Sequence, residues 1–194
     1  MKNPNTVYLA LDFDGVLHHH SAGLLRSDVF DPAQSAESFV EMLEKRFPAN
    51  ITEPFFQADG KLFDREYFLE CVLELLPTAQ VVISTSWRRQ IPANRIVEFL
   101  SPIVRERIVG VLDHSDLERT EKGVRGVLME KWLRDHAVAG DAVWLGIDDQ
   151  ANHYAQHPQN VFKTHWRGLT QDDVESIVVK VASMCGTRMP CKID

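Results

Sequence analysis

The chain has 194 residues with 21 Lys and Arg against 28 Asp and Glu, which gives a formal net charge of −7 at pH 7. Hydrophobic residues make up 44% and charged residues 25%, a composition that is typical of a globular protein and excludes a disordered or fibrous one. The acidic balance argues against a protein that is held on nucleic acid or on an anionic membrane mainly by its charge.

The cysteines and the N-terminus indicate the compartment. Cys71, Cys185 and Cys191 form no C-x-x-C pair, so we expect a reducing environment without a disulfide framework. The N-terminal apolar stretch Val7–Leu11 is too short for a signal peptide. No apolar run approaches the roughly 18 residues of a membrane helix. We therefore expect a soluble, cytoplasmic protein.

Five short apolar runs predict the strands of a parallel sheet. They are apolar without alternation, which is typical of strands that are buried on both faces. In chain order they are Val7–Leu11, Val81–Ser84, Arg107–Leu112, Ala142–Ile147 and Asn160–Thr164.

Amphipathic segments between these runs predict helices. The first spans Asp64–Leu76, and we expect Asp64 to cap it. Its apolar stripe consists of Tyr67, Phe68, Cys71, Val72, Leu75 and Leu76. The stripe of the second consists of Val124, Val127, Leu128 and Trp132. The third opens with the box-like Thr170–Asp173, and its stripe consists of Val174, Ile177, Val178, Val181 and Ala182. This alternation of strands and helices predicts a doubly wound α/β sheet with right-handed crossovers.

The connection between the first two strands is longer than a crossover helix needs. We interpret residues 18–63 as a flap or cap that is inserted into a single domain spanning residues 1–194. A second helical pattern, Ser35–Phe47, lies within this insertion.

Polar side chains follow three of the predicted strands. Asp12 and Asp14 follow the first strand, and Thr85 and Ser86 follow the second. Asp148 and Asp149 follow the fourth strand. Since ligands bind beyond the carboxyl ends of parallel strands, we expect these side chains to meet at one rim of the sheet. Four carboxylates would repel one another there unless a cation lay between them, and hard oxygen ligands suit Mg²⁺.

Such a rim suits phosphate chemistry. A carboxylate beside the metal can attack phosphorus and form an aspartyl-phosphate. A carboxyl two residues along can protonate the leaving oxygen and then activate water. A hydroxyl and one cationic side chain would hold the equatorial phosphate oxygens.

The D-x-D-G-V motif, the strand ending in Thr-Ser and the later Asp-Asp pair together resemble the phosphatase branch of the haloacid dehalogenase (HAD) superfamily. The resemblance implies a Rossmann-like sheet of the HAD type. It implies that Asp12 is the nucleophile and Asp14 the general acid and base. Thr85 would be the phosphate-binding hydroxyl, with Ser86 as the alternative.

The resemblance also implies a metal site and a phosphate-binding cation. Asp148 would be an Mg²⁺ ligand beside Asp12, Asp149 would support it, and the backbone carbonyl of Asp14 would bind the same ion. The cation lies near the start of the helix before the fourth strand in this superfamily. Both Lys122 and Arg125 fit that position, and the sequence leaves the choice open.

Further segments resemble a HAD subfamily that was named for its occurrence in multidomain RNA-repair proteins. They are VVISTSWR at 81–88, LSPIVRERIVG at 100–110, Trp132-Leu133 and the late GLT at 168–170. This resemblance implies removal of terminal phosphates from polynucleotide ends.

Several other residues admit two interpretations. Arg88 and Arg89 could bind a second phosphate and Trp87 could stack a base, or the three could be a packed indole with two solvated charges. The pair 18 and 20, both histidines, could contact substrate or metal, but a polar flap is the simpler interpretation. His153 and His157 have metal-ligand spacing without further ligands, so we expect no metal there.

We therefore expect a Mg²⁺-dependent phosphomonoester hydrolase that works through an aspartyl-phosphate at Asp12. Its substrate would be a nucleotide or a polynucleotide terminal phosphate. We expect no membrane partner and no extended surface track that binds nucleic acid along its length. The alternatives are a small-metabolite phosphatase, which the acidic charge favours, and a non-catalytic HAD-like binding or regulatory module. The oligomeric state is left open.

Overall fold

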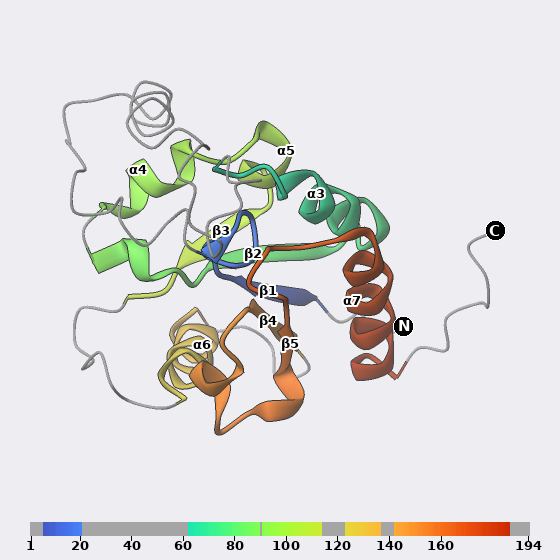
Figure 1. Cartoon of the computed structure of the whole chain (residues 1–194). Coiled ribbons are helices and arrows are strands. Elements are labelled where there is room, and N and C mark those ends of the chain that lie inside the picture. The colour runs from blue at the N-terminus through green and yellow to red at the C-terminus, as the bar shows by residue number, and fades with distance from the viewer. Residues whose placement is uncertain (1–5, 21–61, 90, 114–122, 137–141, 187–194) are drawn as a thin grey trace.

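A parallel sheet organises the chain. The structure is a computed structural model that describes residues 6–20, 62–89, 91–113, 123–136 and 142–186, without the side chain of Arg89. Its five strands all run parallel in the order β3-β2-β1-β4-β5 (Figure 1). They are β1 (Val7–Leu11), β2 (Ala79–Ile83), β3 (Ile108–Val111), β4 (Val143–Asp148) and β5 (Val161–Lys163). The predicted α/β fold and all five predicted strands are confirmed, with ends that differ by at most two residues.

Helices cover both faces of the sheet. On one face, α3 (Glu66–Leu75) and α7 (Gln171–Met184) pack against each other, and on the opposite face lie α6 (Val124–Asp135) and the 3₁₀ turn η3 (Ala151–Tyr154) (Figure 1). Short helices α4 (Ala93–Glu98) and α5 (Pro102–Arg105) precede β3. The remaining 3₁₀ turns are η2 (Ser86–Arg89) and η4 (Pro158–Asn160). The short helices and the 3₁₀ turns were not predicted.

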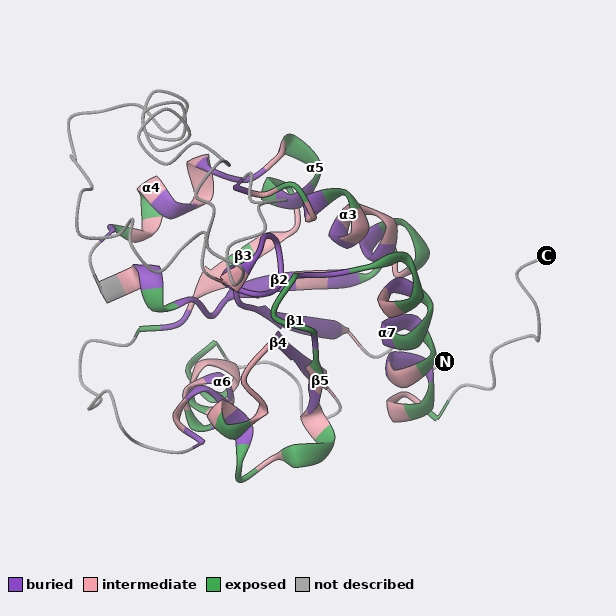
Figure 2. Cartoon of the chain, in the orientation of Figure 1, coloured by how far each residue is buried: buried purple, intermediate pink, exposed green. Residues whose placement is uncertain are grey.

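Strand β1 shows why the apolar runs have no alternation. Val7, Leu9 and Leu11 belong to the core beneath α3 and α7, whereas Tyr8 and Ala10 belong to the core beneath α6. All five residues are buried, as are most residues of the neighbouring strands β2 and β4 (Figure 2). A central strand between two layers needs apolar side chains on both faces.

The α7 prediction is confirmed in detail. Thr170 Oγ1 accepts a hydrogen bond from the N–H of Asp173, and the Asp173 carboxylate accepts one from the N–H of Thr170, which together form a capping box. The predicted apolar stripe is the buried face of the helix: Val174, Ile177, Val178, Val181 and Ala182.

The predicted stripe of α3 is confirmed in part. Four of its six residues pack against the core, namely Phe68, Cys71, Val72 and Leu76. Tyr67 is 65% exposed and Leu75 is 44% exposed, and the fully buried apolar residues are Leu69, Val72 and Leu73. Leu69 lies three and four residues before the other two, so these residues share one face, which overlaps the predicted stripe. The N-cap is Arg65 rather than Asp64, and no side chain caps the helix.

The predicted stripe of α6 is likewise confirmed only in part. Val127 is 38% exposed, while the buried positions are Arg125, Gly126 and Met129. Leu128 and Trp132 pack partly buried against the core. The polarity pattern failed because a charged side chain, Arg125, points inward.

Other expectations have mixed outcomes. Cys71 and Cys185 are free thiols, as expected, while Cys191 lies outside the described residues. Most of the 18–63 insertion, including Ser35–Phe47, also lies outside them. Among the described helices, none combines the length and the hydropathy of a transmembrane segment.

The sheet register aligns the strand ends on one rim. Leu11 pairs with Ile83 on one side and with Ile147 on the other. The ladder continues beyond these pairs, because the N–H of Asp12 donates to the Ile147 carbonyl and the N–H of Ser84 donates to the Leu11 carbonyl. The residues that follow β1 and β2 are therefore neighbours in space of the residues at the end of β4, although the three segments lie far apart in the sequence.

Candidate active site

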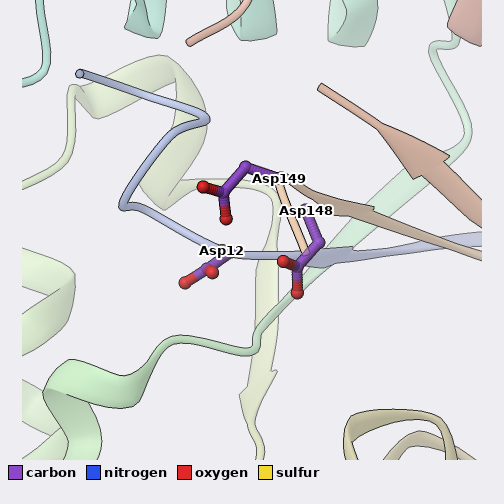
Figure 3. Close-up of side chains that lie close together, drawn as sticks. All are labelled: Asp12, Asp148 and Asp149. Atoms are coloured by element: carbon purple, nitrogen blue, oxygen red, sulfur yellow. The ribbon is translucent and has the colours of Figure 1, made fainter. Parts of the chain in front are cut away.

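Three carboxylates meet at this rim. Asp12, Asp148 and Asp149 each offer an oxygen, and these atoms lie within 4.8 Å of one another (Figure 3). Asp12 is 2% exposed and Asp148 is fully buried. We call these three residues the acidic cluster. Its position follows from the register of β1 and β4.

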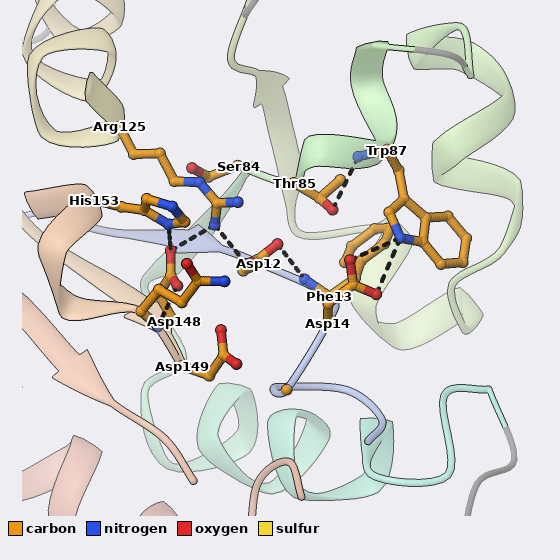
Figure 4. A network of polar contacts seen from close by, with 12 residues as sticks. Asp12, Phe13, Asp14, Ser84, Thr85, Trp87, Arg125, Asp148, Asp149 and His153 are labelled. Carbon is orange, nitrogen blue, oxygen red and sulfur yellow. Dashed lines mark hydrogen bonds and ion pairs between the residues drawn. The ribbon is translucent and has the colours of Figure 1, made fainter. Parts of the chain in front are cut away.

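Arg125 reaches the acidic cluster from the start of α6. Its Nη1 lies 2.5 Å from Oδ2 of Asp12 and 2.5 Å from Oδ2 of Asp148, and the residue is 5% exposed (Figure 4). One guanidinium therefore bridges the ends of β1 and β4. Of the two predicted cations, the structure brings Arg125 to the rim, whereas Lys122 lies outside the described residues.

Asp148 has two further contacts that fix its orientation. Its Oδ1 accepts a hydrogen bond of 2.8 Å from the N–H of Gln150, and its Oδ2 lies 3.3 Å from Nδ1 of His153. His157 instead lies beside Glu130, with 3.5 Å between the imidazole and the carboxylate. The two histidines therefore have different partners, and His153 lies beside Asp148, which its sequence spacing did not predict.

Burial and charge shift the pKa values in this site. Burial raises the pKa of Asp12 to about 8, with Asp148 and Asp14 adding to the rise and Arg125 opposing it. For Asp148, burial also raises the pKa, but Arg125 and His153 outweigh it, so the net shift is downward. The pKa of Arg125 is raised, because its carboxylate partners outweigh the effect of burial.

The side chain of Asp14 turns away from the acidic cluster (Figure 4). Trp87 Nε1 lies 3.2 Å from its Oδ1 and 3.1 Å from its Oδ2, and His18 Nε2 lies 3.0 Å from Oδ1. Trp87 is 2% exposed and His18 is fully buried. The stacking role considered for Trp87 is therefore wrong, because its ring offers no free face. His18 is likewise a buried partner of Asp14 rather than part of a polar flap.

The residues after β2 differ in burial. Thr85 is fully buried, and its Oγ1 accepts the N–H of Trp87 at 3.4 Å. Ser86 is exposed. Arg88 donates from Nη1 to the Ile91 carbonyl at 3.5 Å, which turns its guanidinium toward its own loop. Arg89 has no described side chain.

Asp149 packs against the loop that follows β1. Gly15 has a φ of +71°, and a Cβ atom there would lie 2.6 Å from Oδ2 of Asp149, so the position requires glycine. The Gly15 carbonyl accepts a 2.6 Å hydrogen bond from Oγ1 of Thr164. His20 Nδ1 lies 2.8 Å from Oδ2 of Asp149, and this contact raises the pKa of His20 although burial opposes it.

The acidic cluster fits a hard divalent cation. Its donors are all carboxylate oxygens, which Mg²⁺ prefers. Oδ1 of Asp149 is buried and has no hydrogen-bond partner within the described part of the chain. Three carboxylates with one bridging guanidinium leave excess negative charge for a cation to offset. The Asp14 side chain is not part of this cluster. The ligand predicted from Asp14 is its backbone carbonyl, and that assignment stays a prediction.

Comparison with known proteins identifies the family. The family model described as the HAD domain in Swiss Army Knife RNA repair proteins matches residues 8–174. The chain belongs to this HAD family. A solved structure, the HAD domain of effector protein Lem4 from Legionella pneumophila, is similar to this HAD domain with 15% identity and a TM-score of 0.47. The match covers 93% of this chain and 95% of that one. No curated protein matches the chain.

Metal binding can be tested without any substrate. We expect millimolar Mg²⁺ to raise the melting temperature of the HAD domain, because a ligand that binds the folded state stabilises it by mass action. Asp149→Asn removes one candidate ligand and should abolish most of that rise. Asp172→Asn, at an exposed position on α7, is the matched control and should leave the rise unchanged. Equal Mg²⁺ responses in both variants would contradict a metal site at the acidic cluster.

Proposed function

We propose that this HAD domain is a Mg²⁺-dependent phosphomonoester hydrolase that works through an aspartyl-phosphate on Asp12. The observation that carries the proposal is the bridge of Arg125 between Asp12 and Asp148 inside the acidic cluster. This arrangement would bring the nucleophile Asp12, the phosphate-binding cation Arg125 and the metal ligands of the acidic cluster to one point. Membership of the HAD family supports the same reaction class.

In the proposed reaction, a carboxylate oxygen of Asp12 attacks phosphorus. Oδ1 of Asp12 accepts the N–H of Phe13 at 2.8 Å while Oδ2 contacts Arg125, so the carboxylate has a fixed orientation before substrate binds. Such fixed orientation lowers the entropic part of the barrier. Asp14 would give a proton to the leaving oxygen and then take one from the water that hydrolyses the phosphoenzyme.

Arg125 and Thr85 would bind the transferred phosphoryl group. Both carboxylate contacts of Arg125 use Nη1, and a guanidinium has further N–H groups for phosphate oxygens. Thr85 Oγ1 lies at the start of η2, where its hydroxyl and nearby backbone N–H groups can donate to the same oxygens. Mg²⁺ bound by Asp12, Asp148 and Asp149 would offset the charge of the carboxylates and of the phosphoryl group.

The substrate we propose is a nucleotide or a polynucleotide terminal phosphate. Trp166 follows β5 and is 41% exposed, with the guanidinium carbon of Arg167 lying 4.9 Å from its ring centroid. Its carbonyl accepts the N–H of His20, whose imidazole contacts Asp149. The backbone of Trp166 is thus linked through His20 to the acidic cluster, and the base of a bound nucleotide would stack on the exposed indole. The role once considered for Trp87 fits Trp166 better.

The nucleophile assignment has a direct test. Asp12→Asn should lower kcat/KM for p-nitrophenyl phosphate with Mg²⁺ by at least about 10³-fold, because the amide cannot form the acyl-phosphate. Circular dichroism should show an unchanged fold. Asp135→Asn on the exposed end of α6 is the control and should keep full activity. Full activity in Asp12→Asn would contradict the proposal, and a wild type without turnover on a broad phosphate panel would favour a binding module.

The substrate assignment has its own test. Trp166→Ala should lower kcat/KM for a nucleoside monophosphate and for a phosphorylated oligonucleotide by roughly tenfold, since stacking of one base contributes about 1–3 kcal/mol. Activity on glycerol phosphate, which has no ring, should change little. A loss of similar size on all three would oppose base stacking. Preference of the wild type for glycerol phosphate would support the small-metabolite alternative.

A further inference from the structure

The Asp14 carboxylate is held by two side chains, one from a distant part of the chain and one from the loop that follows β1. Asp14 is 6% exposed, and its partners are the indole N–H of Trp87, 73 residues along, and Nε2 of His18, four residues along. His18 lies outside the motifs on which the family resemblance rests, whereas Trp87 lies within the segment VVISTSWR at 81–88. This inference concerns what they do for Asp14, and it rests on the proposed function.

Trp87 is fixed in place by a group of aromatic rings. The ring centroids of Phe13, Phe63 and Phe99 lie 5.7, 5.9 and 5.8 Å from that of Trp87, all in edge-on geometry. An indole nitrogen can only donate. Trp87 therefore presents a rigid N–H to Asp14, and its substitution by phenylalanine would remove the donor while keeping an aromatic ring.

Phe63 is in an unusual backbone conformation at the same place. Its φ is +61°, which is uncommon and costly for a residue with a large side chain. In this conformation its ring packs 5.2 Å from His18 and 5.5 Å from Phe13, measured between ring centroids. The first and the last residue of the 18–63 insertion thus meet beside Asp14. Contacts that maintain a strained residue in this way are common at functional sites.

The hydrogen bonds of His18 indicate its tautomer. Nδ1 of His18 is buried and has no hydrogen-bond partner among the described residues, whereas Nε2 faces Oδ1 of Asp14. A buried N–H without a partner costs more than a bare lone pair, so the proton belongs on Nε2. His18 is then a donor to Asp14, as Trp87 is.

The two oxygens of Asp14 differ as a result. Oδ1 faces two donors, Nε2 of His18 at 3.0 Å and Nε1 of Trp87 at 3.2 Å, whereas Oδ2 faces Trp87 alone at 3.1 Å. An oxygen that accepts two hydrogen bonds is a poor site for a proton. The carboxyl proton therefore belongs on Oδ2.

We propose that Trp87 and His18 are positioning residues that hold Asp14 outside the acidic cluster and present its Oδ2 to the leaving group. As Asp12 forms its bond to phosphorus, the bond from phosphorus to the leaving oxygen breaks, and that oxygen takes the Oδ2 proton. Asp14 is left as a carboxylate that accepts both N–H groups. Water then loses a proton to Asp14 while its oxygen bonds to phosphorus, and the Asp12 oxygen leaves as a carboxylate.

The experiment varies the leaving group, because only a poor leaving group needs the proton. Trp87→Phe and His18→Leu are assayed by kcat/KM on p-nitrophenyl phosphate, phenyl phosphate and a nucleoside 5′-monophosphate. We expect a change of less than about 3-fold for p-nitrophenyl phosphate and a loss of about 100-fold for the nucleotide, with phenyl phosphate between them. His18→Gln keeps a side-chain N–H donor and should recover most of the loss.

Trp144→Phe is the matched control, since Trp144 is a buried indole in the core on the α6 face of the sheet. It should leave the leaving-group dependence unchanged. Equal losses on all three substrates, or no loss on any, would overturn the positioning role while leaving the proposed hydrolase intact. A wild type that hydrolyses none of the substrates would instead overturn the proposed function, and this inference with it.

Discussion

The buried ion pair between Arg125 and the carboxylates of Asp12 and Asp148 is the interaction on which the site depends. A charge removed from water is costly unless it is paired, and here one guanidinium nitrogen lies 2.5 Å from both carboxylates. The pair joins α6 to the ends of β1 and β4. Loss of Arg125 would leave two buried carboxylates without their counter-charge, and so the orientation of α6 and the chemistry of the rim are determined together.

Glycines allow close packing beneath the rim. Gly146 lets η3 approach the sheet, because a Cβ there would lie 2.5 Å from the Tyr154 ring, and Gly126 lets α6 approach the segment after η3, because a Cβ there would lie 2.9 Å from the His157 ring. Gly15 has the corresponding role beside Asp149. Small residues at these three positions let the elements that carry Arg125, His153 and Asp149 come close enough to share one site.

The sequence was sufficient for the sheet and for the rim, because both follow from local patterns. Continuous apolar runs predict buried parallel strands, and polar residues after such strands must gather at their carboxyl ends. The sequence was insufficient to predict the placement of side chains whose partners are far away along the chain or lie in irregular loops. Helical polarity does not place Arg125 on the buried face of α6, although the family resemblance names it as a candidate cation, and the burial of Trp87 depends on Phe63, which lies at the far end of the insertion. The contact of His18 with Asp14 likewise depends on a loop conformation that no periodicity predicts.

The proposed mechanism requires a covalent bond between Asp12 and phosphorus, and borohydride trapping tests for this bond most directly. Borohydride reduces an acyl-phosphate to the alcohol, so that a phosphorylated aspartate becomes homoserine. After turnover of a phosphate ester with Mg²⁺ and quenching into borohydride, peptide mass spectrometry should find homoserine at position 12 and none at Asp14, Asp148 or Asp149. Homoserine at one of those three positions instead, or at no position while hydrolysis proceeds, would contradict Asp12 as the nucleophile.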